Sequence, residues 1–206
     1  MTHALYQDYL TISTCDLADA LPRTQFMDFR IHPLWADMPR VAGRAYTVKC
    51  APGDHLMVHK AIYDALSGDI LVVEADDQYA VSGGNVCAIA QQNGIAGFIV
   101  DGVVRDIDEV KALQFPIHAL GVCPKPGAKK ILTEDLPTVT VGGVTVVAGD
   151  IIVADNDGVA VIPQAQAEEA LLIAQQRNTK DAGQTLTQWR QNHHDNVQAI
   201  IHALAK

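Results

Sequence analysis

Two short apolar runs constrain the fold of this 206-residue chain more than any other feature. Residues 70–74 (ILVVE) and 95–100 (IAGFIV) have the length and composition of buried strands. Residues 84–93 lie between them, have helical character and end at Asn93-Gly94, a common C-terminal helix cap. Strands joined through a helix in this way lie parallel. The sequence therefore predicts an α/β fold with a βαβ core whose strands are covered on both faces.

The loops that leave these two strands carry the candidate chemistry. Gly83-Gly84-Asn85-Val86 opens the helix, and Arg105-Asp106 follows the second strand. Because the strands are parallel, both loops should lie at the carboxyl edge of the sheet, where ligands of α/β proteins usually bind. Unpaired N–H groups at a helix start favour an anion, arginine is always charged, and a carboxylate can hold a hard cation. The sequence thus predicts a site for a small anionic ligand.

Simpler interpretations of the same residues remain open. The two glycines could form only a tight turn into the helix. Asp106 is followed three residues later by Glu109, a helix-capping pattern, so Asp106 could be an N-cap and Arg105 its surface neighbour. Asp101, at the end of the second strand, could add a carboxylate to the site or cap the turn.

The second half of the chain has a different character. Residues 138–163 are expected to form short Val- and Ile-rich strands separated by glycine turns, and Val141-Gly142-Gly143-Val144 is a strong hairpin signal. Pro163 can begin a helix, and a final helix is expected from about Leu186. We expect a single domain over residues 1–206 with a C-terminal helical arm at about 186–206.

Composition and charge exclude several classes of protein. The net charge is −9 and basic residues are not clustered, which argues against a nucleic-acid surface. No apolar stretch approaches the roughly 20 residues that span a bilayer, so no membrane association is expected. The first residues lack the basic flank and apolar run of a signal peptide. The four cysteines are scattered without a CxxC pair, which predicts reduced, buried thiols in a cytoplasmic protein.

Other candidate motifs are weaker. His55 and His59 have the i,i+4 spacing of a metal pair, but no HExxH pattern or third ligand accompanies them, so a packed helix is favoured. Residues 155–158 (DNDG) match only the start of a calcium loop, and a turn between strands is the better interpretation. The chain contains no nucleophile elbow, Walker motif or nucleotide-binding GxGxxG.

The chain resembles the family that contains 4-hydroxy-4-methyl-2-oxoglutarate aldolase and the regulator of ribonuclease activity A. The motifs that carry this resemblance are GDHLMVHKAI, SGDILVVE, the GG…NGIAGFIVDGVVRD core at 83–106 and VGGVTVVAGDIIVADNDGVAVIP at 141–163. It covers roughly residues 14 to 185. The resemblance implies a layered α/β sandwich similar to phosphohistidine swivelling domains, assembled as a homotrimer or as a hexamer of two trimers.

The resemblance also implies roles for individual residues. Backbone groups of Gly83, Gly84, Asn85 and Val86 would bind the pyruvyl end of a small 2-oxoacid. Arg105 would bind the substrate and act in catalysis, and Asp106 would hold a divalent cation, Mg²⁺ or Mn²⁺. The implied activity is that of a class II (metal-dependent) pyruvate aldolase, with oxaloacetate decarboxylase activity in some members.

Two departures from the family separate this chain from many of its aldolases. Gly84 and Asn85 stand where many aldolases have Asp or Glu followed by leucine, and that acid is a candidate for orienting the proton-transferring water. Aldolases also present a glutamate from a neighbouring subunit, where this chain has Gln175 and Gln176. The leading hypothesis is a metal-dependent lyase that acts through a pyruvate enolate. The alternatives are a non-catalytic regulator that binds a ribonuclease or another enzyme, and a related enzyme that applies enolate chemistry to a different acid.

Overall fold

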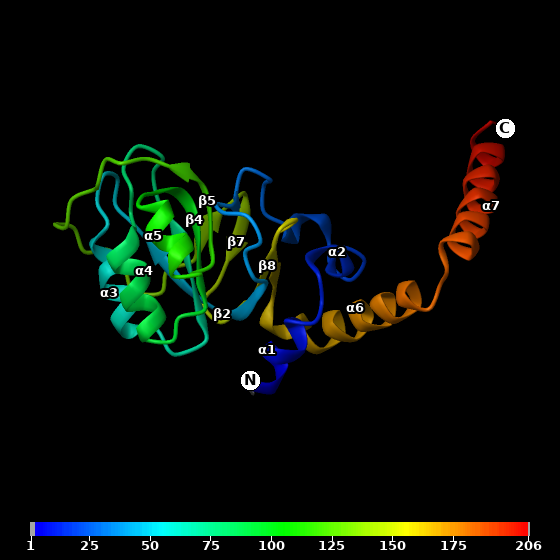
Figure 1. The fold of residues 1–206 in the computed structure, drawn as a ribbon, viewed down its shortest axis with the longest axis horizontal. Helices are drawn as coiled ribbons and strands as arrows, with labels where there is room; N and C mark the ends of the chain where they lie inside the picture. The colour runs from blue at the N-terminus through cyan, green and yellow to red at the C-terminus, as the bar shows by residue number, and fades with distance from the viewer. Residues whose placement is uncertain (1–2, 206) are drawn as a thin grey trace.

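A computed structural model describes residues 3–205 of the chain, drawn in Figure 1. Its helices are α1 (His3–Tyr9), α2 (Thr14–Leu17), α3 (Leu56–Asp64), α4 (Gly84–Gln92), α5 (Ile107–Ala112), α6 (Ala167–Ala182) and α7 (Leu186–Leu204), with 3-10 turns η1 (Arg23–Gln25) and η2 (Gln164–Gln166). Its strands are β1 (His32–Pro33), β2 (Val41–Lys49), β3 (Asp69–Glu74), β4 (Gly97–Val104), β5 (Ile117–Val122), β6 (Val139–Val141), β7 (Val144–Val146), β8 (Ile151–Asp155) and β9 (Gly158–Ile162).

Seven of the strands form one mixed sheet in the order β1-β5-β4-β3-β2-β8-β9. β2, β3, β4 and β5 are mutually parallel, whereas β1, β8 and β9 pair antiparallel with their neighbours. The predicted βαβ unit is therefore confirmed as β3–α4–β4. The mixed α/β architecture, with its large and mostly parallel sheet, also confirms the predicted fold class.

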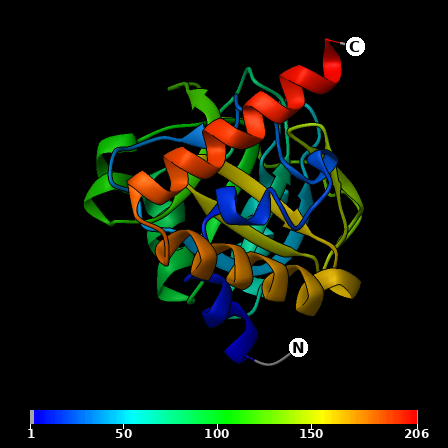
Figure 2. The same ribbon diagram turned by 90° about the vertical axis from the view of Figure 1, so that its right-hand side faces the viewer.

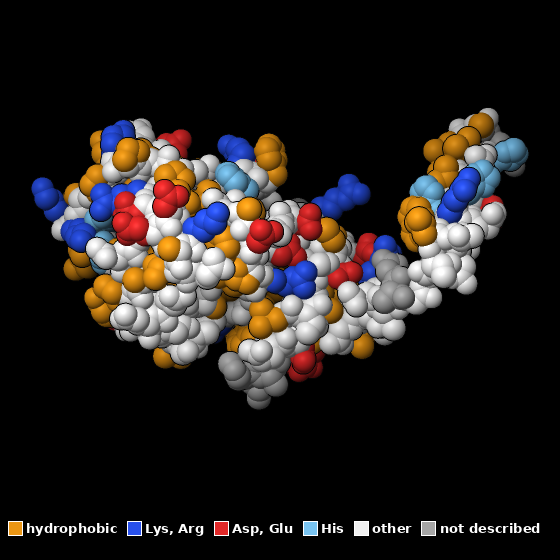
Figure 3. All heavy atoms as spheres, viewed as in Figure 1, with side chains coloured by type: hydrophobic (Ala, Val, Ile, Leu, Met, Phe, Trp, Pro, Cys, Tyr) orange, Lys and Arg blue, Asp and Glu red, His pale blue; other side chains and the backbone are white. Residues whose placement is uncertain are grey.

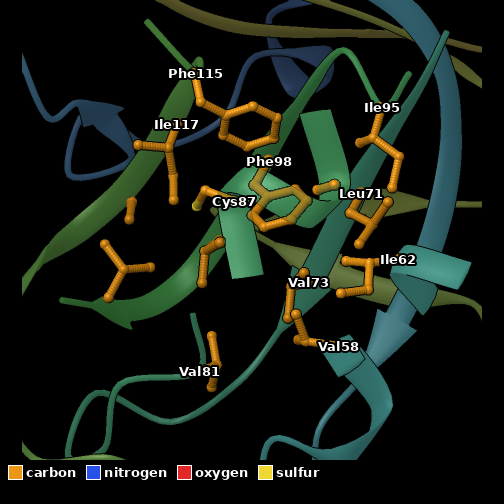
Figure 4. Close-up of a cluster of buried hydrophobic side chains, with 14 of the residues drawn as sticks. Val58, Ile62, Leu71, Val73, Val81, Cys87, Ile95, Phe98, Phe115 and Ile117 are labelled. Atoms are coloured by element: carbon orange, nitrogen blue, oxygen red, sulfur yellow. The ribbon is translucent and has the colours of Figure 1, made fainter. Parts of the chain in front are cut away.

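Alternate residues of the central strands point to opposite faces of the sheet. Leu71 and Val73 of β3 pack beneath α3, α4 and α5, together with Phe98 and Cys87 (Figure 4). Ile70 and Val72 pack instead against the hairpin β6–β7 on the other face. Since both faces are covered, the central strands are apolar throughout, as the sequence predicted.

A third group of buried side chains joins the two ends of the chain. Residues of α1, α2 and α6 pack on β8 and β9, and the Tyr9 hydroxyl donates a hydrogen bond of 2.6 Å to the Ala167 carbonyl. Helix α6 leads away from this cluster toward α7, which Figure 1 shows well separated from the sheet and its covering helices. Figure 2, turned by 90°, shows α6 and α7 on the same side of the molecule.

Several local predictions can be compared with this fold. Gly142 and Gly143 have positive φ (55° and 77°) in the tight turn between β6 and β7, which confirms the hairpin. Buried thiols are confirmed for Cys50 and Cys87 and are wrong for Cys15, which is exposed, and Cys123, which is half-buried. Within residues 3–205, no helix has both the length and the apolar composition needed to cross a membrane.

Candidate functional site

Backbone pairing beyond the end of β3 brings the two predicted loops together. The parallel ladder between β3 and β4 ends at Glu74 and Asp101, but β4 continues to Val104. The chain after β3 folds back along this extension: the Val81 N–H donates to Val103 O and the Arg105 N–H donates to Ser82 O, each at 3.0 Å. The next residue is Gly83, so the start of α4 lies directly beside the Arg105-Asp106 loop.

Asp106 precedes α5 but does not cap it. Its backbone is left-handed (φ 59°) and its side chain makes no capping hydrogen bond, so the alternative in which Asp106 is a capping side chain does not hold. The carboxylate lies over the neighbouring helix instead, where Oδ2 accepts the Gly84 N–H at 3.2 Å. The same oxygen is 3.4 Å from Nε of Arg105. Asp106 thus connects α4 to Arg105, with Oδ2 making both contacts.

Glu109 occupies the space beside the second glycine. A Cβ added at Gly84 would collide with the Glu109 carboxylate, and one added at Gly83 would collide with Asp106 and lie 3.0 Å from Cγ of Arg105. The two glycines therefore allow two carboxylates and an arginine to approach the first turn of α4. The sequence singled out Glu109 only as a capping residue and missed this placement.

A cavity of about 170 Å³ opens at this point. Its lining comes from α3, the segment before α4, the start of α4, the Arg105-Asp106 loop and one distant loop. The lining residues are His55, His59, Ala80, Ser82, Gly83, Asn85, Val86, Arg105, Asp106 and Lys129. Five of the six predicted site residues line this cavity, and the sixth, Gly84, is bonded to Asp106 at its edge.

The two histidines of α3 face this cavity, although the sequence favoured a packed helix for them. Their rings meet edge to face, with centroids 4.8 Å apart. Burial, followed by the charge of Lys129, lowers the pKa of His59 to about 4, and the same causes with Arg105 lower the pKa of His55. Nδ1 of His55 is 3.2 Å from the Ala80 carbonyl, which can only accept, so the neutral ring keeps Nε2 as an acceptor.

Lys129 reaches the cavity from a loop that the sequence did not associate with the site. Buried Asp54 holds this loop: its carboxylate accepts the Lys130 N–H at 2.6 Å and the Leu56 N–H at 2.9 Å. The His55 N–H also donates to Ala128 O at 2.8 Å. These bonds fix the loop against the start of α3. They place a second cation beside Arg105.

Two other features lie outside this site. Asp101 accepts the Gly142 N–H at 2.8 Å and thus holds the turn of the β6–β7 hairpin on the other side of the sheet. A larger cavity of about 710 Å³ adjoins the opposite ends of the parallel strands. Both of its arginines are already paired, Arg44 with Asp69 at 2.7 Å and Arg40 with Asp155 at 3.2 Å. None of the predicted site residues lines it, so the smaller cavity is the candidate site.

The donor set fits a magnesium-like ion better than a softer metal. Across residues 3–205, no three His, Cys, Asp or Glu side chains gather as a metal-binding group. Mg²⁺ commonly keeps several waters and uses only one or two protein carboxylates together with substrate oxygens. Asp106 offers one carboxylate at the cavity, and the carboxylate of Glu109 lies close by against Gly84.

Comparison with known proteins places this geometry in a family. The RraA-like family model, described as Aldolase/RraA, matches residues 14–161, which include every residue lining the cavity. The chain belongs to the RraA-like family.

RraA-like relatives carry two kinds of name. A Thermus thermophilus protein named 4-hydroxy-4-methyl-2-oxoglutarate aldolase is 32% identical over 73% of this chain and 92% of its own. One from Halalkalibacterium halodurans, which bears the same name provisionally, is 40% identical over 84% of this chain and 83% of its own. The solved structure of the RNA-processing inhibitor RraA, also from Thermus thermophilus, is 30% identical, with a TM-score of 0.67, over 74% of this chain and 93% of that chain.

Similarity to a solved structure extends over nearly the whole chain. An uncharacterized Pseudomonas syringae protein of known structure superposes with a TM-score of 0.81 at 26% identity, and the match covers 93% of this chain and 95% of that one.

Proposed function

We propose that this protein is a divalent-metal-dependent lyase that cleaves a small 2-oxoacid through a pyruvate enolate. The observation that carries the proposal is a small cavity lined by Arg105, Lys129, Asp106 and residues of the first turn of α4. Its volume of about 170 Å³ is below the range of about 300–1,000 Å³ typical of drug-sized ligands, so a small acid is favoured. The names of the aldolase relatives support a lyase.

The cationic groups would bind and orient the acid. N–H groups in the first turn of α4 have no partner within the helix, and those of Asn85 and Val86 lie at the cavity beside Arg105. The substrate carboxylate would bind there, which brings the 2-oxo oxygen toward Arg105. Lys129 would draw the anion into the cavity, and the neutral imidazoles of His55 and His59 would offer hydrogen bonds without adding charge.

Cleavage breaks the C3–C4 bond of the substrate. In a 4-hydroxy-2-oxoacid the 4-hydroxyl loses its proton as this bond breaks, and in oxaloacetate the bond breaks with loss of carbon dioxide. Both routes place the electron pair in a pyruvate enolate, which is then protonated at C3. A cation held by Asp106 would supply Lewis-acid polarisation of the 2-oxo oxygen. Arg105 would stabilise the charge that develops on that oxygen. Glu109, whose carboxylate lies against Gly84, would accept the hydroxyl proton.

Pyruvate release tests the proposal. We expect release from oxaloacetate, from 4-hydroxy-2-oxoacids or from both, in the presence of Mg²⁺ or Mn²⁺. Arg105→Ala should lower kcat/KM by about 10²- to 10³-fold, since it removes a donor to the developing oxyanion. Arg190→Ala is the matched control, because Arg190 lies on α7, far from the cavity. Absence of pyruvate from both substrate classes with either ion would exclude the lyase.

A regulatory role is the second candidate, because the 30%-identical structure from Thermus thermophilus is titled an RNA-processing inhibitor. In that case the protein would bind a ribonuclease or another enzyme without catalysis. A stoichiometric partner in a pull-down, retained by Arg105→Ala and found in a protein that releases no pyruvate, would favour this role. We further propose, from the family resemblance, that the chain assembles as a homotrimer or hexamer and acts in the cytoplasm.

A further inference from the structure

The proposed cleavage needs a proton donor that the preceding assignments do not supply. Both substrate classes leave a pyruvate enolate, and C3 of that enolate must gain a proton to give pyruvate. Decarboxylation of oxaloacetate frees no proton within the site, so a donor common to both reactions must be linked to solvent. A water molecule in the cavity meets this requirement if the surrounding side chains orient it.

The cavity has the room and the polar lining that an ordered water requires. A water molecule takes about 30 Å³ of liquid volume and needs about two to four polar partners when it is buried. The cavity measures about 170 Å³. His55 directly precedes α3 and His59 follows it by one helical turn, so both rings border the cavity from the same face of α3. Their centroids are 4.8 Å apart, so one water can reach nitrogens of both rings.

The two imidazoles offer such a water complementary hydrogen bonds. Nδ1 of His55 is 3.2 Å from the Ala80 carbonyl, so this nitrogen carries the proton and Nε2 accepts. Among residues 3–205, none forms a hydrogen bond with the ring of His59, so its N–H is free to donate into the cavity. Burial, together with the charge of Lys129, lowers the pKa values of both rings and keeps them neutral at pH 7. The pair therefore presents one acceptor and one donor.

We propose that His55 and His59 position the water molecule that protonates C3 of the pyruvate enolate. This inference rests on the proposed lyase reaction. The water donates one O–H to Nε2 of His55 and accepts the His59 N–H, which leaves its second O–H for the substrate. Both histidines are positioning residues, because the water is the group that reacts.

The proton balance closes for both substrate classes. The enolate electron pair forms the new C3–H bond, an O–H bond of the water breaks, and the resulting hydroxide keeps its hydrogen bond from His59. In decarboxylation the hydroxide takes a proton from solvent. In retro-aldol cleavage it takes the proton that Glu109 removed from the 4-hydroxyl. Neither imidazole changes its protonation state.

Exchange of the C3 protons of pyruvate tests this step separately from bond cleavage. In heavy water with Mg²⁺ the protein should replace these protons with deuterium, and proton NMR follows the loss of the methyl signal. His59→Phe keeps an aromatic ring beside His55 but removes both nitrogens. We expect kcat for exchange to fall about 10²-fold, at the lower end of the range for general acid–base catalysis, because the water remains without its orientation. KM for pyruvate should change little, since its carboxylate binds at α4 and Arg105.

Conservative changes separate the orientation of the water from support of the fold. His55→Asn retains a donor for the Ala80 carbonyl and removes only the Nε2 acceptor, so it should lose exchange as His59→Phe does. His59→Gln returns a hydrogen-bonding group near the position of Nε2 and should recover most of the rate. His202→Phe is the matched control, because His202 lies on α7, which projects away from the body in Figure 3. It should exchange at the wild-type rate.

Lys129 is the competing proton donor at the cavity. If the histidines orient the water, Lys129→Met should raise KM for pyruvate more than it lowers kcat for exchange. Loss of exchange in Lys129→Met, with wild-type exchange in His55→Asn and His59→Phe, would overturn the inference and leave the lyase intact. Failure of His59→Gln to recover exchange would overturn it as well. A wild-type protein that neither releases pyruvate nor exchanges its C3 protons would overturn the lyase, and the inference with it.

Discussion

Asp106 adopts a left-handed backbone at the entrance to α5, a conformation that most non-glycine residues avoid. Aspartate tolerates it better than bulkier residues do. This backbone conformation turns the Asp106 side chain away from α5 and toward the first N–H of α4. The sequence could identify Asp106 as important, but both capping and metal binding were compatible with it. The backbone conformation, which the sequence does not specify, is accompanied by the absence of a capping hydrogen bond from the Asp106 side chain.

Replacing Asp106 tests the cation site directly. Asp106→Asn preserves the size of the side chain and an oxygen for the Gly84 N–H, but removes the charge that a hard cation requires. We expect affinity for Mg²⁺ or Mn²⁺ to fall by at least about tenfold in calorimetric titration, equivalent to about 1.4 kcal/mol. Asp108→Asn, an exposed change two residues away, should leave the affinity unchanged. Equal affinity for the metal ion in both variants would mean that Asp106 has only a structural role.

Glu109 can be tested separately from the cation. If it accepts the hydroxyl proton, Glu109→Gln should lower kcat for 4-hydroxy-2-oxoacids by about 10²- to 10⁴-fold with little change in KM. Decarboxylation of oxaloacetate has no hydroxyl proton to remove, so it should be much less affected. A parallel loss with both substrates would indicate that Glu109 acts on a step common to both reactions.

At the scale of elements, the local sequence pattern was sufficient to predict a unit when its parts are close both in sequence and in space. The β3–α4–β4 unit and the β6–β7 hairpin were predicted because apolar runs and turn residues define them locally. The pairing of residues 81–82 with the end of β4 was not predicted, because the segment after β3 has no strand pattern. That pairing is nevertheless what places Gly83 beside Arg105.

The hairpin provides a comparison of two adjacent glycines. Both have positive φ, but a Cβ at Gly142 would lie 2.7 Å from Cβ of Met27, whereas one at Gly143 would meet no atom within 4 Å. Gly143→Ala should therefore cost only the backbone strain, about 1 kcal/mol in the free energy of unfolding. Gly142→Ala should cost about 3 kcal/mol or more, since overpacking is added. Urea denaturation of the two variants measures the difference, and equal losses would contradict the assigned contact.

At the scale of the molecule, segments that are distant in sequence contribute residues to the site that the sequence analysis did not predict. The predicted residues lie within one continuous stretch, whereas His55, His59 and Lys129 arrive from other parts of the chain. Lys129 depends on hydrogen bonds between residues 76 apart in sequence. The i,i+4 histidine spacing was visible, but the sequence did not indicate which face of α3 would border a cavity.

Stability should depend on pH through three histidines that are buried or half-buried. Burial lowers the pKa values of His55, His59 and His118 below 6.5, so the folded protein binds fewer protons than the unfolded chain as the pH falls below that value. Their contribution to the free energy of unfolding is fully present above about pH 6.5 and is lost as the pH falls toward 4. We expect the urea midpoint to decrease between pH 7 and pH 5. His118→Gln should reduce that decrease, while His202→Gln, on the exposed arm, should not.

The pairing beside β4 also bears on the order of folding. Gly84 and Asp106 are only 22 residues apart, and the chain between them consists of α4 and β4. Contacts of short sequence separation cost little loop entropy and form quickly. The first turn of α4 and the Arg105-Asp106 loop can therefore come together before β8, β9 and the C-terminal helices are synthesised. We therefore expect hydrogen exchange during refolding to protect α4 and β4 before the C-terminal helices.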